Sequence, residues 1–136
     1  NQWRESSVAN PDPATYDGVY ESFSNKGSGY TAAIMHIDIS GYNTFKLYVR
    51  SYAESSYDYV VVSNLDATLT NSTTTGDSVK LTTSGKQNSG VNISDYQLVE
   101  FTNIGGGNHR ISVMYRKDSS GNEGTDQGYL LVPKEQ

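Results

Sequence analysis

Apolar residues in this chain alternate with polar ones, and no window of a dozen residues carries apolar positions at helical spacing. Alternation with β-branched and aromatic enrichment is typical of strands that are buried on one face. The pattern predicts strands at 18–23, 30–39, 44–52, 57–64, 79–83, 96–102, 109–117 and 128–132. About eight short strands separated by turns favour an all-β fold, a single-domain antiparallel β-sandwich of jelly-roll type over residues 1–136.

Glycine and proline mark the ends of several predicted strands. Residues 105–108 read Gly-Gly-Gly-Asn, a turn sequence in which positive φ has a low steric cost. Pro11 and Pro13 keep residues 1–16 as an extended N-terminal entry segment, and Pro133 ends the pairing of the last strand.

The predicted strand 44–52 has two distinct faces. Phe45, Leu47 and Val49 share one face and are expected to point into the core. The other face combines cations with aromatic rings and is expected to point to solvent; its residues are Lys46, Tyr48, Arg50 and Tyr52.

The predicted strand 109–117 repeats this arrangement. Ile111, Val113 and Tyr115 are expected to point inward. The residues expected to point outward are Arg110, Ser112, Met114 and Arg116.

Composition narrows the classes of function. The 136 residues carry 15 acidic and 10 basic side chains, a net charge of −5, and no cysteine. Because the cations are dispersed, no nucleic-acid partner is expected. The lack of cysteine excludes disulfides, zinc knuckles and thiol nucleophiles, and the apolar runs are too short for membrane insertion. The abundance of Ser, Thr, Asn and Tyr is typical of extracellular β-domains, so we expect a secreted or cell-surface protein.

The 11 tyrosines are the first candidate chemistry. Tyr and Trp rings stack on the C–H face of sugars, and neighbouring cations or amides bind sugar hydroxyls. The same tyrosines also suit cross-strand packing alone, and Trp3 also suits the role of a plug at the open end of the domain. The predicted ligand-binding residues are Lys46, Tyr48, Arg50, Tyr52, Arg116 and Trp3.

The second candidate is the loop after residue 117. Asp118, Ser120 and Asn122 alternate as oxygen ligands do in calcium loops, and Asp126 adds a carboxylate. The loop departs from the EF-hand spacing, and a polar turn with Asx hydrogen bonds accounts for the same residues. A structural Ca²⁺ therefore stays one of two interpretations, and no other cofactor is expected.

No recognisable catalytic set occurs in the sequence. His36 and His109 lie in strand patterns without catalytic spacing to a serine, and no nucleophile elbow, zinc-binding helix or phosphate-binding loop is present. We therefore expect that this domain is not an enzyme. The one connection to catalysis that stays open is that it serves as an accessory domain of a carbohydrate-active enzyme.

Two segments resemble a known group of modules. Residues 109–129, HRISVMYRKDSSGNEGTDQGY, and residues 37–52, IDISGYNTFKLYVRSY, are similar to the MAM and choice-of-anchor J group of jelly-roll modules in bacterial surface and secreted proteins. The resemblance implies a non-catalytic, carbohydrate-binding-module-like β-sandwich within a larger exported protein. The positions that it matches in the last hairpin have a structural role there and carry over no ligand site; they are Lys117, Asp118, Ser120, Gly124 and Asp126.

These observations favour a glycan-binding or adhesion module whose partner is a carbohydrate or cell-surface glycan. The alternative is a structural or assembly domain without a small ligand, such as a spacer of a surface protein or a fibre or decoration module of a phage particle. With either function, the domain could also contact other modules of a larger protein or further copies of itself.

Overall fold

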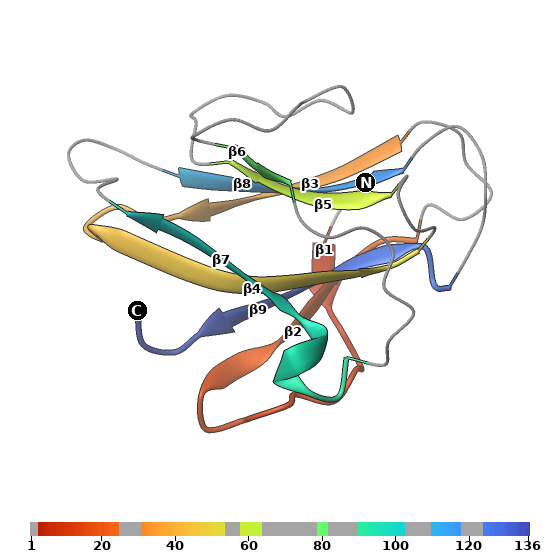
Figure 1. Cartoon of the computed structure of the whole chain (residues 1–136), viewed down its shortest axis with the longest axis horizontal. Helices are drawn as coiled ribbons and strands as arrows, with labels where there is room; N and C mark the ends of the chain where they lie inside the picture. The colour runs from red at the N-terminus through yellow and green to blue at the C-terminus, as the bar shows by residue number, and fades with distance from the viewer. Residues whose placement is uncertain are drawn as a thin grey trace.

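Two stacked antiparallel sheets form the part of the chain that the computed structural model describes, residues 3–24, 31–53, 58–63, 79–81, 90–102, 110–117 and 124–136 (Figure 1). The elements are β1 Trp3–Glu5, β2 Tyr16–Ser22, β3 Thr31–Asp38, β4 Thr44–Tyr52, β5 Tyr59–Ser63, β6 Val79–Leu81, the 3₁₀ turn η1 Ile93–Asp95, β7 Gln97–Thr102, β8 Arg110–Lys117 and β9 Gln127–Pro133. The strand orders are β1-β2-β9-β4-β7 and β3-β8-β5-β6. The predicted all-β antiparallel sandwich is confirmed.

The core between the sheets follows from strand alternation. Phe45, Leu47 and Val49 of β4 are at most 4% exposed, and Val113 and Tyr115 of β8 are fully buried. They belong to one cluster that also contains residues of β5, β7 and β9. Fully burying an apolar side chain of this size stabilises the fold by about 1.5–3 kcal/mol. The inward faces predicted for strands 44–52 and 109–117 are confirmed.

The outer face of β8 is less exposed than the sequence predicts. Ser112 and Met114 are fully buried, so the prediction that they face solvent is wrong. Met114 packs with Val61, Ile34 and Tyr59 in a small cluster separate from the main core. Because β8 lies between β3 and β5, its neighbours shield side chains that alternation alone would expose.

The N-terminal entry segment contributes a strand that the sequence pattern did not predict. Residues Trp3 to Glu5 pair with Tyr20 to Ser22 as the edge strand β1. The Trp3 indole N–H donates a hydrogen bond of 3.0 Å to the carbonyl oxygen of Ala33 on β3, in the other sheet. A strand of three residues is too short to show a period, which explains why alternation did not reveal it.

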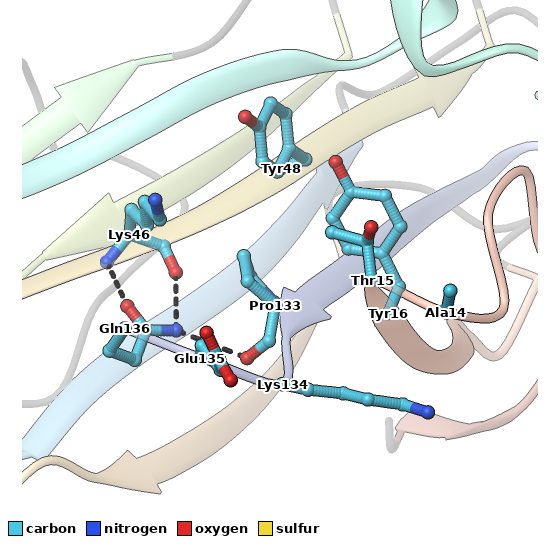
Figure 2. A pocket seen from close by; sticks show the side chains of 9 residues that line it. All are labelled: Ala14, Thr15, Tyr16, Lys46, Tyr48, Pro133, Lys134, Glu135 and Gln136. Atoms are coloured by element: carbon cyan, nitrogen blue, oxygen red, sulfur yellow. Dashed lines mark hydrogen bonds between the residues drawn. The ribbon is translucent and has the colours of Figure 1, made fainter.

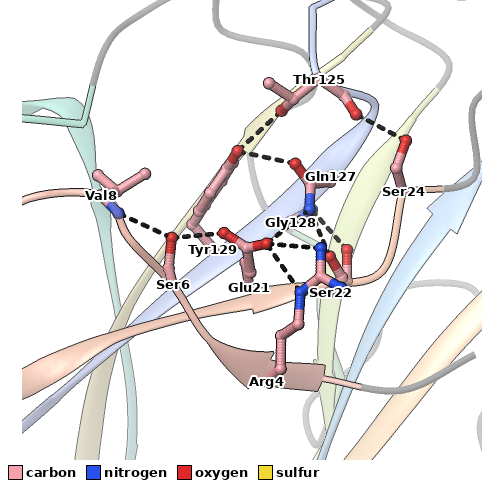
Figure 3. Close-up of polar contacts among 10 residues, drawn as sticks. All are labelled: Arg4, Ser6, Val8, Glu21, Ser22, Ser24, Thr125, Gln127, Gly128 and Tyr129. Carbon is pink, nitrogen blue, oxygen red and sulfur yellow. Dashed lines mark hydrogen bonds and ion pairs between the residues drawn. The ribbon is translucent and has the colours of Figure 1, made fainter.

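A polar network fastens β1 to β2 and β9 (Figure 3). Glu21 Oε2 accepts hydrogen bonds from Arg4 Nε at 3.0 Å and Gln127 Nε2 at 3.1 Å, and Oε1 accepts one from the Ser6 hydroxyl. Burial by itself raises the pKa of the Glu21 carboxyl, but these hydrogen bonds outweigh it and hold the pKa below its ordinary value. Gln127 also donates to the carbonyl of Ser22, so the first and last strands of the chain share one network.

The outer face of the five-stranded sheet carries a second cluster. Tyr16, Val19, Tyr96, Tyr129 and Leu131 are buried there, in a group separate from the core between the sheets. The half-buried side chains packed against this cluster are Val8, Tyr48 and Tyr52. The polypeptide around residues 8 and 96 thus covers part of a face that strand alternation assigns to solvent.

Candidate functional site

An open pocket lies on this outer face, where β4, the start of β2 and the end of the chain meet (Figure 2). Its volume is about 590 Å³, within the range of small-molecule sites. The residues that line it are Ala14, Thr15, Tyr16, Lys46, Tyr48, Pro133, Lys134, Glu135 and Gln136. Lys46 and Tyr48, both predicted as ligand-binding residues, are therefore brought together with a set that is distant in sequence.

Two tyrosine rings form the aromatic wall of the pocket. Tyr16 and Tyr48 meet edge to face, with ring centroids 5.6 Å apart and planes at 79°. Burial raises the pKa of the Tyr16 phenol, and the neighbouring Tyr48 and Asp12 raise it further. Its hydroxyl stays protonated at neutral pH, so it is able to donate and accept hydrogen bonds.

Lys46 is held in place through its backbone. Its N–H donates to Gln136 Oε1 at 2.7 Å, and its carbonyl accepts from Gln136 Nε2 at 3.0 Å. Opposite this position β9 ends in Pro133, which has no N–H to donate. The side-chain amide of Gln136 thus supplies to β4 the hydrogen bonds that the neighbouring strand no longer makes.

Arg50 does not belong to this open surface. The side chain is only 4% exposed, so the prediction that it points to solvent is wrong. Its guanidinium carbon lies 3.9 Å from the ring centroid of Tyr129 and 5.4 Å from that of Tyr96. Gly90 covers it closely, because a Cβ at this glycine would fall 2.4 Å from the guanidinium. Arg50 therefore has a packing role in the second cluster.

Tyr52 is half-buried and lies outside the pocket. Its carbonyl accepts a hydrogen bond of 2.8 Å from the N–H of Asp126, and Gly124 lies against its ring. The row predicted as one binding surface is therefore divided. Lys46 and Tyr48 line the pocket, whereas Arg50 and Tyr52 pack against β9 and the segments that lead into β7 and β9.

The two remaining predicted ligand residues lie elsewhere in the sandwich. Arg116 is on β8 in the four-stranded sheet, with its guanidinium carbon 5.8 Å from the centroid of Tyr59. Trp3 packs against the main core and hydrogen-bonds across the sheets to Ala33. Its part in ligand binding stays a prediction.

The calcium interpretation concerns a loop that is described only at its end. Asp118, Ser120 and Asn122 lie outside the described residues. Asp126 is fully buried, and its carboxylate faces the Tyr115 hydroxyl and the Lys117 ammonium. In the described ranges no three acidic or histidine side chains gather as metal ligands. A structural Ca²⁺ held by Asp118, Ser120, Asn122 and Asp126 stays a prediction.

The sequence pattern did not identify several residues of the pocket. Tyr16 lay just before the first predicted strand, and Lys134, Glu135 and Gln136 followed the last one. Their proximity to Lys46 depends on the pairing of β9 with both β2 and β4. No local signal in the sequence reports that pairing.

Comparison with known proteins adds no relative. No protein-family model, curated protein or solved structure matches the chain. The resemblance of residues 37–52 and 109–129 to the MAM and choice-of-anchor J group stays a prediction. Among the described residues, no helix has the length and apolarity that a membrane crossing requires.

Proposed function

We propose that this chain is a non-catalytic glycan-binding module that receives a sugar in the pocket of Tyr16 and Tyr48. The observation that carries the proposal is the half-buried Tyr48 ring beside Lys46 in an open pocket. An aromatic face packs on the C–H face of a sugar ring, and polar neighbours bind its hydroxyls. Contact with Tyr16 limits the motion of the Tyr48 ring before binding, which reduces the entropy lost with the ligand.

The charges around the pocket support an acidic sugar as the ligand. Among the residues that line it, Lys46 and Lys134 carry ammonium groups and Glu135 carries a carboxylate. Asp12 acts on Tyr16 from outside this lining. The lining itself has one more cation than anion, in a chain whose net charge is −5. A uronic acid or a sulfated sugar gains from it, and this part of the binding is expected to weaken as salt rises. An open pocket leaves much of the ligand in water, so we expect weak affinity.

The test is retention on immobilised glycans, with neutral, uronic-acid and sulfated sugars compared. We expect Tyr48→Ala to weaken retention about tenfold, because a lost ring contact on the order of 1.4 kcal/mol changes affinity by that factor. Tyr42→Ala is the matched control, since Tyr42 is 45% exposed and contacts Phe45 outside the pocket. We expect it to bind like the parent chain.

Circular dichroism of each variant separates lost binding from lost folding. Unchanged retention by a folded Tyr48→Ala, Lys46→Ala double variant would exclude this pocket as the site. The absence of retention by the parent chain on all three sugar classes would exclude the proposed function.

We also infer jelly-roll connectivity and a place in a larger exported bacterial protein. When β1 is set aside, the order β2-β9-β4-β7 facing β3-β8-β5-β6 supports a jelly roll, because the first strand lies beside the last and the second beside the one before it. Together with the family resemblance, this order supports a module at the cell surface or outside the cell.

One observation favours the alternative of an assembly domain. The segment leading into β7 exposes Val91 at 51% and Ile93 at 39%, and β7 itself exposes Leu98 at 48%. β7 is an edge strand of its sheet, a position from which another chain can be paired. Sedimentation at rising concentration discriminates the two functions, because a stable trimer without response to any sugar would favour assembly over glycan binding.

A further inference from the structure

A buried group of ionisable side chains joins the end of β8 to the start of β9. Lys117 is 1% exposed, and Asp126 and Asp58 are fully buried. Lys117 Nζ lies 3.4 Å from Asp126 Oδ2. None of the three lines the pocket of Tyr16 and Tyr48, so the proposed glycan binding makes no use of them.

The two oxygens of the Asp126 carboxylate have different surroundings. Oδ1 accepts a hydrogen bond of 2.5 Å from the Tyr115 hydroxyl. Oδ2 accepts no hydrogen bond within the described part of the chain and faces the Lys117 ammonium. A donor fixed on Oδ1 draws electron density from the carboxyl carbon and stabilises negative charge that develops on that oxygen. The carboxyl carbon is therefore prepared for attack by an amine.

The strand register points to Asp58, the residue just before β5, as a neighbour of Lys117. Val60 pairs with Tyr115 and Tyr59 with Arg116, and one further step of this antiparallel register would set Asp58 opposite Lys117. Val60 and Tyr115 both belong to the main core, and alternation puts Asp58 and Lys117 on that same inward face. A buried carboxylate at this place is able to carry a proton between the amine and a leaving oxygen.

A charged form of this group is expensive to bury. Taking a carboxylate and an ammonium out of water costs their hydration free energy, and their attraction offsets that cost only when the geometry is good and the remaining polar atoms are hydrogen-bonded. Here Oδ2 accepts no hydrogen bond in the described part of the chain. An amide between the two groups would remove both charges from the interior.

We propose that Lys117 and Asp126 condense to form an intramolecular isopeptide bond. The ammonium first gives a proton to the carboxylate group, and the lone pair of Nζ then forms a bond to the Asp126 carboxyl carbon. The bond from that carbon to Oδ2 breaks, and Oδ2 leaves as water with a second proton from Nζ, carried by Asp58. One ammonium and one carboxylate become one amide and one water. No electron is transferred to or from an outside reagent.

The intact mass of the folded chain tests the proposal directly. We expect a mass one water below that of the sequence, and Lys117 that trypsin no longer cleaves. No Lys or Arg lies between Lys117 and Lys134, so trypsin should release residues 117–134 as one peptide. The isopeptide bond closes a ring from residue 117 to residue 126 in that peptide, so mass spectrometry should detect no backbone fragments from cleavage within the ring. A folded parent chain whose mass equals that of the sequence, after long incubation at neutral pH, would show an ordinary ion pair and overturn the proposal.

Three variants separate the roles of the groups. Lys117→Met should restore the full mass of its own sequence. Asp126→Asn should still condense, but with the loss of one ammonia in place of one water, a result that an ion pair does not give. Asp58→Ala should slow the loss of mass or abolish it; loss at the parent rate would remove Asp58 from the mechanism. Because the parent chain by itself gives the decisive measurement, a variant that fails to fold does not weaken the test.

Discussion

At the scale of single residues, two glycines decide how closely loops approach the tyrosine-rich outer face. Gly124 has φ +59, and a Cβ there would fall 2.0 Å from the Tyr52 ring and 2.8 Å from the Tyr52 carbonyl oxygen. Gly90 makes the same kind of approach to the Arg50 guanidinium. Side chains that alternation directs outward are therefore covered where a glycine lets the backbone come near.

Gly124→Ala is expected to destabilise the protein by about 1–3 kcal/mol, because alanine disfavours positive φ and its Cβ meets both the ring and the backbone of Tyr52. Gly18→Ala is the matched control. A Cβ at Gly18 would meet no heavy atom within 4 Å, and its φ is not positive, so its stability should stay within about 0.5 kcal/mol of the parent. Chemical denaturation measures both. Equal stabilities of the two variants would contradict this account of Gly124.

At the scale of elements, the attachment of β1 to its sheet depends on the Glu21 side chain, because the strand itself is short. Strand β1 has three residues and one neighbour, β2. The Glu21 carboxylate ties it to β9 through Arg4 and Gln127. Because these hydrogen bonds hold the pKa of Glu21 below its ordinary value of 4.5, the ionised carboxylate stabilises the folded state.

Glu21→Gln is expected to lower the free energy of unfolding by about 1 kcal/mol at pH 7, a modest amount because Glu21 retains some contact with solvent. The contribution of the carboxylate is fully present above pH 4.5 and is lost as the pH falls through the lowered pKa of the folded state. Parent and variant should therefore converge in acid. Glu5→Gln, at an exposed position on β1, serves as the control and should have the stability of the parent at pH 7. A difference between parent and Glu21→Gln that persists below the lowered pKa would contradict this assignment.

At the scale of the whole molecule, Trp3 connects the two sheets. It is the one tryptophan of the sequence, and its indole on the five-stranded sheet binds the Ala33 carbonyl on the four-stranded sheet. It also lies close to Gly128 of β9, where a Cβ would come within 3.0 Å of the indole. Tryptophan fluorescence therefore reports whether the sheets remain joined through β1.

Unfolding by urea is expected to give the same midpoint by tryptophan fluorescence and by far-ultraviolet circular dichroism, because β1 is held by both the Glu21 network and the other sheet. A fluorescence change at clearly lower urea would show that β1 detaches while the sandwich persists, contrary to this prediction. Glu21→Gln, which weakens the Glu21 network, is the informative comparison. If β1 detaches early in any variant, it should be in this one, with a fluorescence midpoint at lower urea concentration than its circular dichroism midpoint.

The sequence by itself determined the features that depend only on neighbouring residues of the same strand. Alternation in 44–52 fixed Phe45, Leu47 and Val49 as core residues and directed Lys46 and Tyr48 to the outer face, because successive strand residues point to opposite sides of a sheet. The sandwich class followed from the number of such strands. These conclusions need no knowledge of which strands pair.

Only the tertiary structure decided which outward side chains stay accessible. Arg50 is covered by Gly90, forty residues away in the chain, and Lys46 is fixed by Gln136, ninety residues away. The approach of Lys117 to Asp126 likewise depends on how β8 and β9 enter different sheets. A period of two assigns a side chain to a face, but exposure and chemical contact depend on segments brought over that face by long-range pairing, which no local pattern encodes.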